Sequence, residues 1–265
     1  MARYDEHVPF LERLLDDERE ALLAFATRRR VPAHRVLFSQ GDEAHCIWVL
    51  LGGHIKLSVS TADGFELVLD MLGPGTLLGE LAFMDRCPRS ATGTTIEPTE
   101  IAAIPFSALE SYLRTHDRVT GLLIGQVCAC LRRSDLRLLE FATSDALGRV
   151  CARIADLADE VGSPTGGLYM VALPVTQSEL ASWTCISREA VVRSLRALRK
   201  LGWLDNDGSV FRSLTYRPSV PVLAARRLGH RQRVSAHNAE CEENDSLRKG
   251  QRSQRERAIG RMVSS

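Results

Sequence analysis

The sequence has little of what marks several classes of protein. Its net charge is only +1 over 265 residues, so any contact with DNA must come from a local basic patch rather than from a global field. The longest apolar runs, Cys46–Leu51 and Gly121–Ile124, are far too short to span a bilayer, and the charged N-terminus lacks the apolar core of a signal peptide. These absences predict a cytoplasmic protein that does not contact membranes.

Metal-binding and catalytic motifs are also missing. The seven cysteines are scattered without any C-x-x-C, and Cys128 and Cys130 would lie on different faces of a helix. The sequence contains no G-x-S-x-G, P-loop, H-E-x-x-H or Rossmann glycine pattern. We therefore expect free thiols in a reducing compartment, no metal and no enzymatic activity.

The hydrophobic pattern of the N-terminal half is first typical of a helix and then typical of strands. Residues 8–30 have the spacing of an amphipathic helix that Pro32 would end. Short apolar runs then alternate with glycine-bearing turns, a pattern that predicts an antiparallel sandwich or barrel. These runs cover residues 36–38, 47–51, 55–59, 67–72, 92–95 and 101–104.

Residues 107–142 are predicted to be helical and to carry a heptad seam. Its members alternate at spacings of four and three residues: Thr120, Ile124, Val127, Leu131, Ser134, Leu138 and Phe141. Such a seam indicates a partner helix and hence a dimer, and the flanking charges favour that interpretation. The alternative is a long helix that packs on its own domain.

The C-terminal part is predicted to contain a helix at 145–161, a strand at 168–173, a helix-turn-helix at 176–201 and a hairpin turning at Asn206–Gly208. Residues 219–265 contain no Phe, Tyr or Trp, with ten basic and five acidic residues. So few core-forming residues predict a disordered tail, which either adds non-specific affinity for DNA or does nothing.

The most informative stretch runs from Gly79 to Thr92. A buried anion requires an arginine fork and backbone N–H groups that small residues leave accessible, and Arg89, Ser90 and Ala91 supply both. Glu80, nine residues before Arg89, would be costly to bury unless it accepts a ligand hydroxyl or pairs with that arginine.

These residues resemble the phosphate cassette of the cyclic-nucleotide-binding domain, G-E-L-A followed by P-R-S-A-T. The resemblance implies a β-roll in which Glu80 binds the ribose 2′-hydroxyl and Arg89 and Ser90 bind the cyclic phosphate, with Gly79 and Ala91 in the same cassette. Gly93 departs from the β-branched residue that is common there. The alternative is a roll without a ligand, in which Arg89 and Glu80 form an internal ion pair.

A second part of the ligand site follows from the same resemblance. In the catabolite-activator branch of the family, a hydroxyl residue on the dimer helix contacts adenine, and that position falls on Ser134, with Asp135 beside it. The alternative is a polar residue in the seam that sets the helix register.

The helix-turn-helix carries two predicted caps. Thr176 begins the first helix with Glu179 three residues later, and Ser187 begins the second. Arg188, Glu189 and Arg193 do not fit the apolar stripe, so they are candidates to read base edges.

The stretch S-R-E-x-V-x-R-x-L-x-x-L resembles the catabolite activator and fumarate-nitrate regulator (Crp/Fnr) family. The resemblance implies six residues at the DNA: Thr176, Gln177, Ser187, Arg188, Glu189 and Arg193. Cys185 departs from the small residue expected at the turn. The alternative is a winged helix that contacts protein.

Together these features predict an α+β protein with an antiparallel β-roll, a long dimerisation helix and a winged helix-turn-helix. The expected parts are a cyclic-nucleotide-binding domain at 1–115, the helix at 116–143, the DNA-binding domain at 144–219 and a tail at 220–265. We expect a transcription regulator with cAMP as effector and DNA, a second copy and RNA polymerase as partners. The alternatives are a regulator that senses redox state, a gas or another small molecule, one that needs no ligand, and a regulatory subunit without DNA binding.

Overall fold

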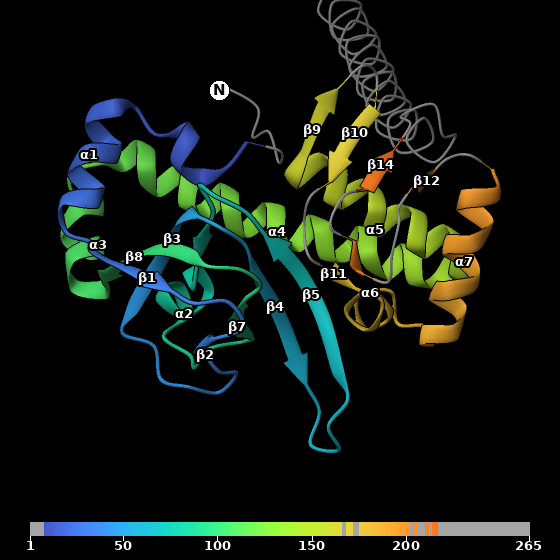
Figure 1. Ribbon diagram of the computed structural model, residues 1–265. Helices are drawn as coiled ribbons and strands as arrows, with labels where there is room; N and C mark the ends of the chain where they lie inside the picture. Colours follow the sequence, from blue (N-terminus) through green and yellow to red (C-terminus); the bar gives the residue numbers. More distant parts are fainter. Residues whose placement is uncertain are drawn as a thin grey trace, which may run out of the picture. The chain divides into compact units, whose positions relative to one another are not determined.

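Two four-stranded antiparallel sheets form the N-terminal part of the protein (Figure 1). The computed structural model describes residues 8–165, 168–171, 175–201, 204–205, 210–211 and 214–216. The first sheet has the order β1 (Thr27–Val31), β8 (Thr99–Pro105), β3 (Cys46–Gly52) and β6 (Leu77–Leu78). The second has the order β2 (Val36–Phe38), β7 (Thr92–Thr95), β4 (Ile55–Ser60) and β5 (Glu66–Leu72).

Strand β3 lies between two apolar cores. Ile47 and Val49 pack toward the helices, whereas Trp48 and Leu50 pack into the cluster between the sheets. Because successive side chains point to opposite faces, a strand buried on both sides needs an unbroken apolar run. This explains why the run at 47–51 does not alternate with polar residues.

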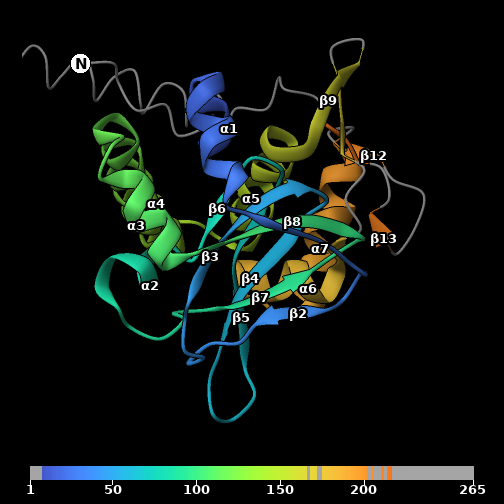
Figure 2. The same cartoon turned by 90° about the vertical axis from the view of Figure 1, so that its left-hand side faces the viewer.

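The helices of this part cover the first sheet. They are η1 (Phe10–Arg13), α1 (Asp16–Ala24), α2 (Glu80–Asp85) and α3 (Phe106–Leu113). Figure 2 shows α1 and α3 near the start of α4 (Asp117–Thr143), and residues of all these segments share one apolar cluster. The predicted single helix at 8–30 was wrong, because residues 27–31 instead pair with β8 as an edge strand.

The predicted helix at 107–142 is divided at Arg114–His116 into α3 and the 27-residue α4. Helix α4 ends at Thr143, where Ser144 takes an extended conformation, and α5 (Ala146–Val161) follows at once. The Arg149 guanidinium donates to the carbonyls of Phe141 and Ser144, at 2.8 and 3.2 Å, and so fixes the break between the helices.

The helix-turn-helix is formed by α6 (Gln177–Thr184) and α7 (Arg188–Lys200), as the sequence predicts. Six short strands accompany it: β9 (Gly162–Thr165), β10 (Leu168–Val171), β11 (Val175–Thr176), β12 (Leu204–Asp205), β13 (Val210–Phe211) and β14 (Leu214–Tyr216). The predicted hairpin was wrong, because β12 pairs with β14 and β13 pairs with β11. The predicted turn at 206–208 and the tail at 220–265 lie outside the described residues.

The α+β class is confirmed, with an antiparallel roll, a long helix and a helix-turn-helix. Among the described residues, no helix is long and apolar enough to cross a membrane. Within the same residues, no three His, Cys, Asp or Glu side chains gather as a metal site would require.

Candidate functional site

The cassette starts at Gly79, which connects β6 to α2 in a left-handed conformation with φ +85°. A Cβ atom at this position would lie 1.9 Å from Nη1 of Arg89. Only glycine allows both the backbone conformation and the close approach of the guanidinium. Gly79 and Arg89 are therefore in direct contact in the structure.

Arg89 is the buried cation of this site, with only 5% of its surface exposed. Its Nη2 donates to the carbonyl of Cys46 at 2.6 Å, and its guanidinium lies 4.7 Å from the centre of the Phe38 ring. Nη1 is buried and has no hydrogen-bond partner among the described residues. Burial lowers the pKa of Arg89 despite the opposing influence of nearby Cys46 and Glu80.

The backbone around Arg89 is fixed by the loop that follows β2. The Arg89 N–H donates to the carbonyl of Asp42 at 2.9 Å, and the Gly41 N–H donates to the carbonyl of Arg89 at 2.8 Å. Ser90 is exposed, and Ala91 is buried directly before β7. Four of the predicted residues, Gly79, Arg89, Ser90 and Ala91, thus lie together.

Glu80 is the first residue of α2 and turns toward α4. Its Oε1 lies 3.9 Å from Sγ of Cys130, which is close enough for a weak hydrogen bond from the thiol. Burial raises the pKa of Glu80, and the positive charge of Arg133 partly opposes this effect. Glu80 and Arg89 do not form a direct ion pair, so the internal pair that the sequence left open is not formed in the described structure.

The other predicted ligand residues are not gathered with the cassette. Ser134 and Asp135 are exposed on α4, and the Ser134 hydroxyl donates to the carbonyl of Cys130 in its own helix at 3.0 Å. Cys130, one turn earlier, is the α4 residue that contacts Glu80. Sequence reasoning missed Cys130, and it also missed the two residues that hold Arg89, Phe38 and Cys46.

Helix α4 uses different faces for its own domain and for solvent. Its buried residues are Val119, Leu123, Gln126 and Ala129. By contrast, Ile124, Leu131 and Leu138 of the predicted seam are 48%, 64% and 66% exposed. The seam is therefore not what holds α4 on its own domain.

Both predicted caps are present in the helix-turn-helix. The Glu179 N–H donates to Oγ1 of Thr176 at 3.1 Å, the Thr176 N–H donates back to the Glu179 carboxylate at 2.9 Å, and the Ala190 N–H donates to Oγ of Ser187 at 3.2 Å. The apolar stripe points inward as predicted, with Leu180, Val191, Leu195 and Leu198 all buried. These local contacts fix where α6 and α7 begin.

The predicted base-reading residues share the exposed start of α7. Arg188, Glu189 and Arg193 are all exposed, while Gln177 is half-buried and Thr176 and Ser187 are exposed at the caps. The pKa of Glu189 is lowered by a backbone hydrogen bond and then by the Ser187 hydroxyl. Arg196, also exposed, lies three residues after Arg193 on the same face and was missed.

Cys185 occupies the turn between α6 and α7 in a left-handed conformation, with φ 52° and ψ 44°. This geometry is the reason a glycine is expected there, because a side chain costs free energy in this region. The turn closes nonetheless, since the Ile186 N–H donates to the carbonyl of Ala181 at 3.2 Å.

Comparison with protein-family models gives two matches. A cyclic nucleotide-binding domain matches residues 28–116, and a Crp-like helix-turn-helix domain matches residues 148–214. The first match contains the cassette around Arg89, and the second contains both caps and the exposed start of α7.

Curated relatives and solved structures agree with these matches. A CRP-like cAMP-activated global transcriptional regulator from Mycobacterium tuberculosis is 28% identical over 202 residues, which cover 76% of this chain and 86% of the relative. The cyclic AMP receptor protein of Thermus thermophilus is 29% identical over 194 residues, covering 73% and 87%. The solved structure of the c-di-GMP responsive global regulator CLP from Xanthomonas campestris is similar with a TM-score of 0.64 at 25% identity, covering 76% of this chain and 98% of that one.

Proposed function

The chain belongs to the family of Crp-like transcription regulators, which join a cyclic nucleotide-binding domain to a helix-turn-helix, and on this premise we propose that it is a homodimeric regulator controlled by cAMP. The family resemblance carried by the sequence motifs is confirmed by these matches. The effector, the dimer and the roles of single residues are our proposal.

One observation carries the proposal of an anionic effector. Arg89 is buried and its Nη1 has no hydrogen-bond partner in the described part of the chain. A buried charge without a full set of partners is costly, and a phosphate would supply the missing acceptor in a bidentate geometry. Ser90 and the small residues Gly79 and Ala91 would complete the phosphate contacts, and Glu80 would accept the ribose hydroxyl.

The choice of cAMP rests on relatives. Both curated relatives described above are named for cAMP, while CLP is described as responsive to c-di-GMP. We propose that Ser134 and Asp135 contact the adenine of cAMP. Both side chains are exposed on α4, Ser134 within the seam and Asp135 next to it, so they would meet the base where a second subunit also approaches.

The dimer and the DNA contacts follow from exposed surfaces. Ile124, Leu131 and Leu138 form an apolar row that a second α4 would bury. We propose that Thr176, Gln177 and Ser187 contact the DNA backbone while Arg188, Glu189 and Arg193 read base edges. A two-fold dimer would then bind a near-palindrome whose half-sites lie about one helical turn apart.

The remaining parts of the proposal come from the sequence and the family. The boundaries between the four segments of the protein would lie between residues 115 and 116, 143 and 144, and 219 and 220. The protein would act in the cytoplasm, with RNA polymerase as a further partner and without enzymatic activity of its own.

Calorimetric titration of the full chain with cAMP, cGMP and c-di-GMP tests the effector directly. We expect the tightest binding for cAMP, together with a higher affinity for a duplex carrying inverted TGTGA half-sites when cAMP is present. Tighter binding of c-di-GMP would replace cAMP as the effector. No binding of any of the three, with unchanged affinity for DNA, would overturn control by a cyclic nucleotide.

A further inference from the structure

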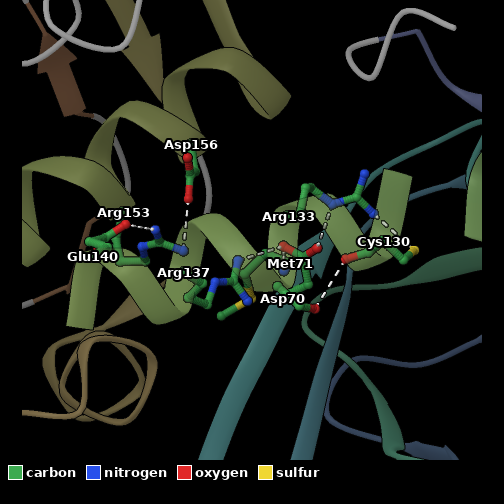
Figure 3. A network of polar contacts seen from close by, with 9 residues as sticks. Asp70, Met71, Cys130, Arg133, Arg137, Glu140, Arg153 and Asp156 are labelled. Atoms are coloured by element: carbon green, nitrogen blue, oxygen red, sulfur yellow. Dashed lines mark hydrogen bonds and ion pairs between the residues drawn. The ribbon is translucent and has the colours of Figure 1, made fainter. Parts of the chain in front are cut away.

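A network of polar and charged side chains lies along α4 (Figure 3). At its centre is Asp70 on β5, which lies between two arginines of α4. The Asp70 carboxylate is 3.8 Å from Nε of Arg133 and 3.6 Å from Nη2 of Arg137, and it accepts a hydrogen bond from the Met71 N–H at 3.1 Å. Asp70 thus joins the second sheet of the roll to the helix that leads out of it.

One end of this network reaches the candidate effector site. Nη2 of Arg133 donates to Sγ of Cys130 at 3.2 Å, and the Cys130 thiol in turn contacts Glu80. Burial raises the pKa of both Glu80 and Asp70, and the charge of Arg133 opposes this effect at both carboxylates. Both carboxylates are therefore linked to Arg133, Glu80 through the Cys130 thiol and Asp70 by an ion pair.

The other end reaches the helix-turn-helix domain. Arg153 of α5 is 2% exposed and pairs with Glu140 of α4 at 2.7 Å and with Asp156 at 2.9 Å. Its guanidinium also lies 5.5 Å from the centre of the Trp183 ring in α6. Arg137 and Glu140 lie three residues apart on α4 and so share one face of the helix. Burial lowers the pKa of Arg137, and the nearby acids Asp70, Asp156 and Glu140 partly oppose this effect.

A change in one ion pair of this network affects ion pairs that lie further along it. Ion pairs away from water are only weakly screened, so a change in one pair alters the balance of its neighbours. A ligand hydroxyl that donates to Glu80 favours its ionised form and increases its attraction for Arg133. Asp70 would then depend more on Arg137, and Arg137 less on the acids that hold Arg153.

We propose that Asp70, Arg133 and Arg137 are positioning residues that link the state of Glu80 to the placement of α5 and α6. The inference rests on the proposed function, because it takes Glu80 as the group that meets the effector. The three residues are assigned to communication between the two domains, and not to contact with the effector or with DNA.

The first experiment needs no effector. DNA affinity of the full-length protein is measured on the inverted TGTGA duplex for wild type, Glu80→Gln, Asp70→Asn and the double variant. We expect Glu80→Gln to change the affinity by at least about 3-fold and Asp70→Asn to remove most of that change, within the range of measured couplings. Additive effects of the two substitutions would overturn the proposal even if cAMP binds as proposed.

The second experiment compares DNA affinity with and without saturating cAMP. We expect Asp70→Asn to reduce this ratio about 5-fold or more while the calorimetric affinity for cAMP changes less than about 2-fold. Asp63→Asn is the matched control, because Asp63 is an exposed acid in the turn between β4 and β5 and should leave the ratio unchanged. An unchanged ratio in Asp70→Asn, or an equal loss of cAMP affinity, would contradict the assignment.

A variant that does not fold cannot decide the matter, so thermal unfolding is recorded for each. Arg137→Lys keeps the positive charge but loses the planar fork, and it serves if Asp70→Asn unfolds. It should reduce the ratio in the same direction, and a wild-type ratio would overturn the proposal. If the wild type binds no cyclic nucleotide, the proposed function fails, and the effector-free cycle still decides the link between Glu80 and Asp70.

Discussion

The candidate effector site and the candidate DNA-reading surface use the same residue type in opposite ways. Arg89 is 5% exposed, pressed against Gly79 and lacking a partner for one of its nitrogens among the described residues. Arg188 and Arg193 are exposed in the first half of α7, a helix whose start is fixed by the Ser187 cap. The first arginine depends on contacts between distant segments, and the second pair depends on local sequence.

This difference predicts how the two regions respond to substitution. A buried charge is held by the residues around it, so substitutions of the charge or of those residues should change both the free energy of unfolding and the affinity for the effector. Substitution of an exposed side chain on a capped helix should change the affinity for the ligand that it contacts and leave folding unchanged.

Gly79→Ala should have the largest effect on the protein. The added methyl would lie 1.9 Å from Arg89 Nη1, and Gly79 has a left-handed backbone conformation. Overpacking and backbone strain together should lower the free energy of unfolding by about 2–4 kcal/mol. Chemical denaturation measures this loss, and calorimetry should show weakened cAMP binding because Arg89 must move.

Gly64→Ala separates strain from steric clash. Gly64 also has a positive φ, +87°, but an added Cβ there would meet nothing within 4 Å. We expect a loss of only about 1 kcal/mol and an unchanged cAMP affinity. Equal losses in the two variants would show that the contact with Arg89 contributes nothing.

Arg89→Ala should weaken cAMP binding by about 2–3 kcal/mol, because the bidentate phosphate contact is lost. Its unfolding free energy should change less than that of Gly79→Ala, since the lowered pKa of Arg89 indicates that folding already disfavours its charge. Titration calorimetry and denaturation on one preparation measure both quantities. Arg30→Ala, an exposed arginine on β1, is the control and should alter neither.

The same contrast explains what could be predicted from the sequence. The caps at Thr176 and Ser187 are contacts between residues three apart, and both were predicted. The motif around Arg89 was recognised by resemblance, but its contacts with Phe38 and the Cys46 carbonyl join segments that no local pattern connects.

Other features escaped prediction for related reasons. Strand β1 is an edge strand whose first four residues are exposed, so it lacks the alternation that marks a half-buried strand. The strands β12 and β13 were both expected, but their pairing with β14 and β11 is decided by residues outside the predicted turn. Asp70 was not noticed, because a single charge on a strand is usually solvated. Arg137 was interpreted only as one of the charges that flank the seam.

Arg188→Ala should have a smaller and more selective effect than Arg89→Ala. We expect a loss of about 1–3 kcal/mol of discrimination at one base pair, with unchanged cAMP affinity and unchanged unfolding. Binding-site selection from random DNA measures this as relaxed preference at that position. Arg199→Ala, at the exposed C-terminal end of α7, should leave the selected sequence unchanged. If the two variants select the same sequence as wild type, reading has been assigned to the wrong residue.

Cys185→Gly should give the smallest change, and with the opposite sign. Cys185 has φ 52°, a conformation that costs a non-glycine residue about 1 kcal/mol, and part of the gain is offset because glycine also has more freedom in the unfolded chain. We expect a net stabilisation of about 0.5 kcal/mol, visible as a rise in Tm of about 1–2 °C. The matched control is Cys128→Gly, at an exposed position within α4, which should lower stability by a few tenths of a kcal/mol because glycine is the poorer helix former. Opposite signs for one substitution would show that the turn, rather than the loss of the thiol, is responsible. A Cys185→Gly variant less stable than wild type would mean that the side chain contributes packing that its exposure does not suggest.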